Sequence, residues 1–471
     1  MRSAILLGFL ALYGCATAPG YRSSSVRPPS SFREDPHPLA PSPSGRGGTQ
    51  DEPAVSSAYW DQLSDSTLSR LVGEVLRGNL DVRSARARVS AARADRVRSV
   101  LDLTPSATLQ AGYSRQRLSS ASFPGAFGVF PDQSVWDAGA NASWDLDLFG
   151  GIRHTVQARG ALADVAQEDL RNVQVTLTAE VARAYFELRG AQEQLDVARR
   201  NAENQRRTFD LTKQRLDAGR GSSFDTERAQ AQLSSTLASI PAREAQVAAA
   251  QYRIGTLVGR APTEVARELE QIGQLPRLPE VTSIGAPETV VRYRPDVASA
   301  ERFAAAQGAL VGAAKASYLP RLTIGGSVGY AAPDFNSVGN QGTLRYVVGP
   351  VLTWPGLNLG RVKAEVDAAA AREDAARAQY GRVVLAAMED METSLARYRA
   401  ARLQVERLED ASAASERAAE LARMRFREGV TDFLQVLDAE RTELEAQDRL
   451  AQSRIDAATA YAALYKAAGG Q

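Results

Sequence analysis

The chain has 471 residues, which is long enough for about three domains or one large core. Its 56 Lys and Arg nearly balance its 55 Asp and Glu, so the bulk charge that attracts nucleic acid is missing and we expect no nucleic-acid partner. Two His and one Cys do not supply the ligands and thiols of zinc sites, thiol catalysis or disulfides. The sequence contains no run of about 18 apolar residues to cross a bilayer as a helix, so a membrane role would depend on strands.

The first fifteen residues have the proportions of a secretory signal. A positive charge at Arg2 precedes a mostly apolar stretch over residues 4–13, and we predict a signal peptide over residues 1–14. The stretch Leu12-Tyr13-Gly14-Cys15 resembles a bacterial lipobox, which implies cleavage before Cys15 and a covalent lipid on that residue. A plain signal peptide with an incidental Cys is the alternative.

The segment after Cys15 is predicted to be a tether. Ala16 stands where lipoproteins retained at the inner membrane usually carry Asp, so the lipobox resemblance implies the outer membrane. Residues 16–56 are rich in Pro, Ser and Gly and cannot bury enough apolar surface to offset their ordering entropy. We therefore predict a lipid-anchored tether over residues 15–56.

Short patterns in the first half of the chain recur in the second half, which indicates a duplication. The spacing is 215 for one set of positions and 210 for another: Asp81, Pro105 and Thr108 match Asp296, Pro320 and Thr323, and Arg215, Gly219 and Ala229 match Arg425, Gly429 and Ala439. We predict one repeat over residues 57–260 and a second over residues 287–471. The Pro-rich residues 261–286 form the predicted linker.

Strands are predicted where apolar and polar residues alternate, over residues 105–116, 134–148, 321–331 and 343–354. The clearest alternation runs from Trp136 to Leu148, with apolar residues at the even positions. Each strand has about the length that crosses a bilayer when tilted, with aromatic residues near the ends. A small amphipathic sheet packed against helices explains the period equally well, so both alternatives stay open here.

Long helices are predicted over residues 152–217, 223–258, 358–428 and 432–467, in two hairpins. A strict heptad repeat supports the first helix, formed by Leu177, Val181, Ala184, Leu188, Ala191, Leu195, Ala198 and Ala202. Its many Ala residues imply close helix packing, and its length of roughly 100 Å at about 1.5 Å per residue exceeds what a compact globular domain needs.

Four strands cannot close a barrel, because about eight are needed merely to surround a core of side chains. Open sheet edges are not tolerated in lipid. If the strands cross a membrane, several chains must therefore contribute to one barrel. A dimer would supply eight strands, whereas a trimer would supply twelve and leave an aqueous lumen, so conduction favours the trimer.

The lipobox, the duplicated strand and helix pairs, and two phrases resemble the TolC-type outer-membrane factors, in particular the OprM/NodT-like efflux lipoproteins. The phrases are Trp144-Asp-Leu-Asp-Leu-Phe-Gly150 and Gly429-Val-Thr-Asp-Phe-Leu-Gln-Val-Leu-Asp438. The resemblance covers nearly all of the chain after Cys15. It implies a mixed α and β fold, in which a homotrimer forms a twelve-stranded outer-membrane barrel continued by a long periplasmic barrel of coiled-coil helices.

The resemblance also implies partners. Proteins of this kind are passive exit ducts, and a periplasmic adaptor (a membrane fusion protein) and an inner-membrane pump, commonly of the resistance-nodulation-division class, supply selectivity and energy. We expect an efflux duct for small molecules with no cofactor besides the lipid on Cys15. Type I protein secretion is possible within the same fold. A lipid-anchored periplasmic coiled-coil spacer or adaptor is the main rival, whereas an enzyme lacks a nucleophile or metal motif.

The hairpin turns are predicted at Gly219 and Gly429, each a helix-ending glycine preceded by arginines suited to a helix carboxyl end. Asp432 and Gln435 have the spacing of a capping box, and these tips are expected to contact the adaptor.

The family resemblance implies that Leu434 and Asp438 narrow the tunnel near its closed end. A solvated carboxylate in an early helical turn is the alternative for Asp438. One branch of the family has a second aspartate where this sequence has Gln435, so an acidic ring here would be weaker.

Overall fold

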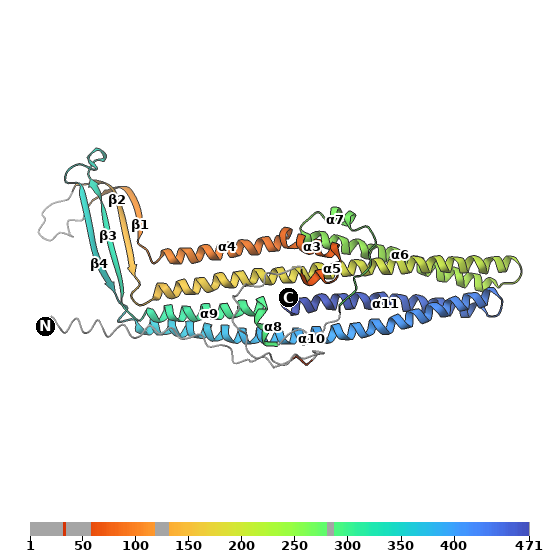
Figure 1. Cartoon of the computed structure of the whole chain (residues 1–471). Coiled ribbons are helices and arrows are strands. Elements are labelled where there is room, and N and C mark those ends of the chain that lie inside the picture. The colour runs from red at the N-terminus through yellow and green to blue at the C-terminus, as the bar shows by residue number, and fades with distance from the viewer. Residues whose placement is uncertain (1–31, 34–57, 118–130, 280–286, 471) are drawn as a thin grey trace. The chain divides into compact units, whose positions relative to one another are not determined.

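The computed structural model describes residues 32–33, 58–117, 131–279 and 287–470. Cys15, the predicted signal peptide and nearly all of the predicted tether lie outside the described residues. The chain forms two compact units (Figure 1). One contains Arg88–Ala166 and Ser299–Gly381, including all four strands, and the other contains Gln167–Ala298, Arg382–Gln471 and the described residues before Arg88.

The two halves of the chain have the same order of elements, a pair of helices, a pair of strands and a long helical hairpin. The first half contains α3 (Ser66–Gly78), α4 (Leu80–Leu101), β1 (Ser106–Gln116), β2 (Gln133–Leu146), α5 (Gly151–Asp217) and α6 (Ser223–Val258). The second contains α8 (Pro287–Tyr293), α9 (Pro295–Ala316), β3 (Arg321–Ala332), β4 (Leu344–Thr353), α10 (Leu359–Arg427) and α11 (Phe433–Ala467). The short helices α2 (Ala58–Asp61) and α7 (Pro262–Glu268) lie outside this pattern, α7 within the predicted linker. The predicted duplication is confirmed.

Among the described residues, none of the helices combines the length and the apolar composition that a bilayer span requires.

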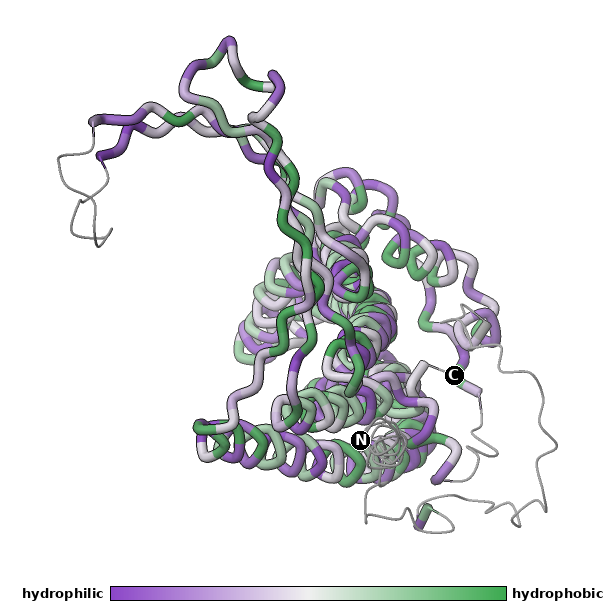
Figure 2. Tube along the Cα trace, turned by 90° about the vertical axis from the view of Figure 1, so that its left-hand side faces the viewer, coloured by the Kyte–Doolittle hydropathy of each residue, from purple (hydrophilic) through white to green (hydrophobic). Residues whose placement is uncertain are grey.

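The four strands form one antiparallel sheet in the order β1-β2-β3-β4. Its register pairs Leu109 with Ala140, Ala140 with Val328, and Val328 with Tyr346, so the apolar residues of all four strands share one face. The adjacent row pairs Thr108 with Asn141 on the opposite face. Figure 2 shows this alternation as hydrophobic and hydrophilic positions along the strands.

The apolar face of the sheet is bare. Strand β1 is exposed along its whole length, Leu109 is 87% exposed, and Tyr346 and Val348 are each 74% exposed. A sheet packed against its own helices would bury these side chains, so that alternative is wrong. The sheet instead has one apolar face and one polar face, both open to the surroundings, with β1 and β4 as its edges.

A tryptophan fixes the entry to the sheet in each repeat. Trp144 Nε1 donates to the carbonyl of Leu103 at 2.9 Å, and Trp354 Nε1 donates to that of Tyr318 at 3.0 Å. Each bond ties the second strand of a pair to the segment just before the first strand. An indole suits such a position because it combines a large apolar body with one polar N–H.

A second duplicated contact closes each repeat on its own return helix. Asn79 Nδ2 donates to the carbonyl of Leu257 at 2.7 Å, near the end of α6, and Arg294 Nη1 donates to that of Ala467 at 3.1 Å, at the end of α11. Asn79 also caps α4, since its Oδ1 accepts from the backbone N–H of Asp81 at 2.7 Å. Asn79 and Arg294 are 215 positions apart, like one set of the matched residues of the two repeats. Both bind the carboxyl end of a return helix, one through an amide and the other through a guanidinium.

The core of the second unit is aromatic around Trp60, which is fully buried. Its ring lies 4.8 Å from that of Tyr465, and Tyr59 stacks on Tyr461 at 4.9 Å. Tyr185 of α5 donates its hydroxyl to Asp65 at 2.6 Å, and Asp65 is the N-cap of α3. These contacts hold α2 and α3 against α5 and α11.

The long helices of the second unit pack closely. All eight heptad residues predicted on α5 are buried. A Cβ on Gly190 would clash with Ile455, so α11 of one repeat packs directly on α5 of the other. The buried side of α6 includes polar residues, because Leu237 is 38% exposed while Thr236 beside it is buried.

Candidate functional site

Both hairpin turns lie in the second unit and share one backbone motif. Gly219 has φ 68° and Gly429 has φ 80°, a region that glycine enters without strain. The N–H of Arg220 bonds the carbonyl of Arg215 at 2.8 Å, and the N–H of Val430 bonds that of Arg425 at 2.9 Å. This pattern closes a helix carboxyl end, as expected from the sequence.

The helix that follows each turn begins with a side-chain cap. Ser222 Oγ accepts from the N–H of Phe224 at 3.2 Å, and Asp432 Oδ1 accepts from the N–H of Gln435 at 3.2 Å. The reciprocal half of the capping box predicted for Asp432 and Gln435 is not formed. Gln435 Oε1 instead accepts from the hydroxyl of Thr431.

The ends of the two hairpins are joined by an apolar cluster. Its buried members are Ala229, Phe426, Phe433 and Val436, and the two phenyl rings are 5.7 Å apart. Ala229 belongs to the first repeat and the other three to the second. The cluster therefore holds the end of one hairpin against the end of the other.

Arg215 provides a polar link beside this cluster. Its Nη1 donates to the carbonyl of Phe426 at 2.7 Å, across 211 positions of sequence, and its guanidinium carbon lies 4.5 Å from the centre of the Phe426 ring. Sequence reasoning assigned such arginines to the carboxyl end of their own helix. Arg215 does bind a helix carboxyl end, but it is that of α10 in the other hairpin.

Leu434 and Asp438 lie outside the apolar cluster. They are four residues apart on α11 and so share one side of the helix. Leu434 is 47% exposed and the Asp438 side chain 74% exposed, with Arg441 Nη2 3.5 Å from the Asp438 carboxylate. An exposed ion pair such as that of Asp438 and Arg441 contributes little to stability. The side chains of Leu434 and Asp438 are therefore both available to line a space filled with water.

The polar face of the sheet is the second candidate site. Asn141 Nδ2 donates to Gln110 Oε1 at 2.9 Å across β1 and β2, and Asp137 pairs with Arg345 of β4 at 3.5 Å. Asp145 accepts a hydrogen bond from the hydroxyl of Thr323. A face with this composition suits contact with water, whereas the opposite face suits lipid.

A family model described as outer membrane efflux protein matches residues 71–260 and 287–470. The chain belongs to this family. The two matches coincide with the two structural repeats, which is what a tandem duplication within the family requires.

Solved structures of outer-membrane channels resemble the chain over nearly its full length. The channel OprN is 36% identical with a TM-score of 0.86, covering 97% of this chain and 99% of that one. The open state of the MtrE outer membrane channel of Neisseria gonorrhoeae is 26% identical with a TM-score of 0.80, covering 97% and 98%. The predicted fold class, a TolC-type channel subunit, is confirmed.

Curated relatives are similar to the chain over nearly their whole length, and one of them is named for export. The pyoverdine export outer membrane protein OpmQ of Pseudomonas aeruginosa is 29% identical over 467 residues, which cover 98% of this chain and 95% of the relative. Nodulation protein T of Rhizobium leguminosarum bv. trifolii is 26% identical over 470 residues, with the same coverage. The chain is an outer-membrane efflux channel protein, as the sequence predicts.

The link between the hairpins predicts a local effect of Arg215→Gln. Losing a charged donor to the Phe426 carbonyl costs about 1–2 kcal/mol, so backbone amides at the ends of α10 and α11 exchange with solvent about 5–30-fold faster. Hydrogen-exchange mass spectrometry of the detergent-purified protein measures this. Arg220→Gln, in the same turn and exposed, is the control, and equal exchange in both variants contradicts the link.

Proposed function

We propose that three copies of this chain form a passive exit duct through the outer membrane, the last part of a tripartite efflux pump for small molecules. The observation that supports it most is the sheet, which has a bare apolar face, a polar face and two edges. In lipid every backbone donor and acceptor must be satisfied within protein, so the edges need partners. Pairing β1 of one copy with β4 of the next satisfies them.

The number of copies follows from the size of the barrel. Two copies supply eight strands, which surround only a packed interior, whereas three supply twelve and leave a lumen. The polar face, with Asn141 and the Asp137–Arg345 pair, then lines water. The apolar face, with Leu109 and Tyr346, contacts lipid.

The partners in this proposal are a periplasmic adaptor and an inner-membrane pump of the resistance-nodulation-division class. Relatives 27% identical over 464 residues are named as outer membrane proteins of antibiotic and toluene efflux pumps in Pseudomonas putida. The exposed apolar residues Phe224 and Val430 flank the hairpin turns and offer the adaptor a docking surface near Gly219 and Gly429. Type I protein secretion is the alternative use of the same duct.

The gate in this proposal lies at the hairpin ends. Leu434 and the link between the hairpins hold the closed state, while Asp438 of each copy contributes to an acidic ring. Carboxylates about 8 Å apart repel by about 0.5 kcal/mol in water and about 2 kcal/mol at an effective dielectric of 20. Such a ring favours cations over anions, but it is too weak to keep the gate shut or to force it open.

The barrel predicts opposite outcomes for two adjacent lysine substitutions. Leu109→Lys places a charge on the lipid face and costs about 2–4 kcal/mol, whereas Thr108→Lys places it on the water face at little cost. Heat-resistant trimers extracted from outer membranes by detergent measure assembly. We expect few trimers with Leu109→Lys and wild-type amounts with Thr108→Lys, and equal yields would refute the barrel.

Asp438 predicts the ion preference of the duct. Asp438→Asn removes the acidic ring. In single-channel recordings in planar bilayers we expect the preference for cations over anions to be lost, while channels still open and close as in the wild type. Asp456→Asn is the control, because Asp456 lies 18 residues, or about five helical turns, further along the same side of α11. Unchanged selectivity in Asp438→Asn excludes this role.

The lipid anchor predicts incorporation of labelled palmitate at Cys15. Wild-type protein takes up the label, whereas Cys15→Ser does not and yet still assembles trimers, because the barrel holds the protein in the membrane. Label in the Cys15→Ser protein would show that another residue is acylated.

A further inference from the structure

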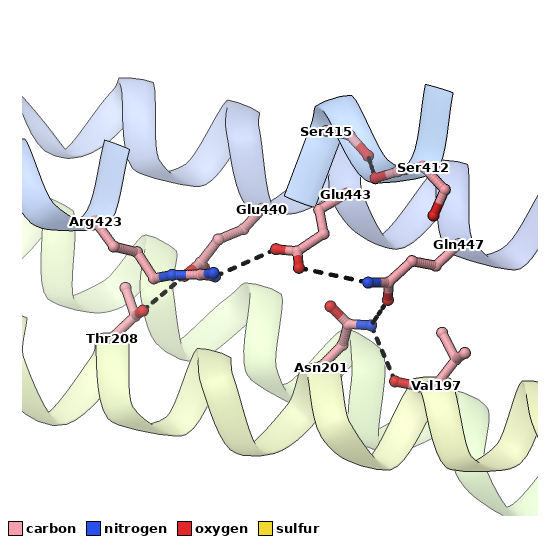
Figure 3. Close-up of polar contacts among 9 residues, drawn as sticks. All are labelled: Val197, Asn201, Thr208, Ser412, Ser415, Arg423, Glu440, Glu443 and Gln447. Carbon is pink, nitrogen blue, oxygen red and sulfur yellow. Dashed lines mark hydrogen bonds and ion pairs between the residues drawn. The ribbon is translucent and has the colours of Figure 1, made fainter. Parts of the chain in front are cut away.

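Three charged side chains lie together between α5, α10 and α11 in the second unit (Figure 3), two of them buried and the third, that of Arg423, 23% exposed. Glu440 and Glu443 of α11 are each only 3% exposed. Arg423 of α10 reaches both, with Nη1 3.5 Å from Glu440 Oε1 and 3.2 Å from Glu443 Oε2. Carboxylates are rarely buried to this degree unless their charge is compensated.

The neutral partners of the two carboxylates come from α5 and α11. Thr208 donates its hydroxyl to Glu440 Oε1 at 2.8 Å. Gln447 Nε2 lies 3.5 Å from Glu443 Oε1, and Asn201 Nδ2 donates to Gln447 Oε1 at 2.8 Å. Since an ionised carboxylate offers about four acceptor positions, these few donors leave both acids under-satisfied.

The charges in this site do not balance. Two ionised carboxylates and one guanidinium sum to −1, and the acid Glu416 of α10 further raises the pKa of Glu443. The groups facing the pair from α5, Thr208 and Asn201, are neutral. Keeping two carboxylates ionised in one buried site costs free energy, and binding one proton removes the excess negative charge.

A neighbouring amide shows the same shortage of partners. Gln205 is 3% exposed, and both its Nε2 and its Oε1 are buried without a hydrogen-bond partner among the described residues. It lies on the face of α5 that carries Asn201 and Thr208, four residues after one and three before the other. A buried amide with neither atom paired indicates that the polar contacts along this face of α5 are incomplete.

We propose that Glu440 and Glu443 form a proton-binding site that, when it holds one proton, locks α11 onto α5 and α10 near the hairpin ends. The proton leaves one carboxylate for one guanidinium and turns the other acid into a hydrogen-bond donor. This site goes beyond the duct itself, because it makes the packing of the hairpins respond to the pH of the surrounding solution.

The sign of the response follows from the burial. Desolvation is the largest effect and raises the pKa of both acids above the ordinary value of 4.5, although Thr208 and Arg423 act in the opposite direction. A group whose pKa is raised by folding stabilises the fold fully below its unfolded pKa. That contribution is lost as the pH rises through the raised value. The hairpins are therefore locked at acid pH and loosened toward alkaline pH.

The test uses the full-length protein in detergent and compares hydrogen exchange at about pH 5 and about pH 8, corrected for intrinsic rates. In the wild type, we expect amides of α11 near Glu440 to open about 10-fold more at the higher pH, because a site that has lost its proton no longer locks the helix. Glu443→Gln leaves one carboxylate and one guanidinium, so its exchange stays slow at both pH values. A wild type without pH dependence overturns the proposal.

Two further variants separate proton binding from simple hydrogen bonding. Arg423→Gln removes the only cation of the triad, so the loosening moves to higher pH. Glu445→Gln, an exposed acid beside Arg441 and Arg449, keeps the wild-type response. A purely structural role predicts instead that Glu443→Gln exchanges faster at every pH, and that result overturns the proposal.

Infrared spectroscopy provides a readout that does not depend on any variant folding. A protonated carboxyl shows a carbonyl stretch distinct from that of carboxylates. We expect the wild type to keep this band to a higher pH than the exposed acids do, and a band that disappears together with that of the exposed acids overturns the proposal. If the variants assemble, Glu440→Gln with Glu443→Gln abolishes the band and Glu445→Gln retains it.

Discussion

The constraint on which this structure depends is that hydrocarbon cannot hydrogen-bond a peptide group. A four-stranded sheet with a bare apolar face satisfies the apolar part of that environment but leaves the outer groups of β1 and β4 without partners in the sheet. In lipid, a single copy would therefore leave the backbone groups at both edges of its sheet without hydrogen-bond partners. The duplication within the chain gives two strand pairs, and only pairing between chains completes the cylinder.

Each repeat solves the same local problems with the same devices. A tryptophan ties the strands to the segment that precedes them, a glycine with positive φ ends the first helix of each hairpin, and one side chain holds the return helix. At the last of these positions Asn79 and Arg294 differ in charge but donate to equivalent carbonyls. The two repeats therefore keep the same contact at this position although the side chain that makes it differs.

Local periodicity carried most of the prediction. The long helices and strands lie within a few residues of their expected bounds, because heptads and alternation repeat over many turns or residues. Helices α4 and α9 were missed because both mix small and charged residues without a clear apolar face. Helix α3 does carry such a face, through Leu68, Leu71 and Val75, and could have been predicted. The contact of Arg215 with Phe426 depends on which hairpins are neighbours, which no local pattern reveals.

The buried side of α5 changes from apolar to polar residues along the helix, although the buried positions keep their helical spacing. Toward its middle it buries Leu188 and Leu195, whereas nearer the hairpin turn it buries Asn201, Gln205 and Thr208. Separating α5 from its neighbours in the apolar part exposes apolar surface, and the free-energy cost is proportional to that area. In the polar part the side chains exchange hydrogen bonds within the protein for hydrogen bonds to water, at little net cost. Separating the helices therefore costs least free energy along the polar stretch of α5. A charge imbalance such as that of Glu440 and Glu443 has the most influence along this polar stretch, which lies between the apolar middle of α5 and the apolar cluster at the hairpin ends.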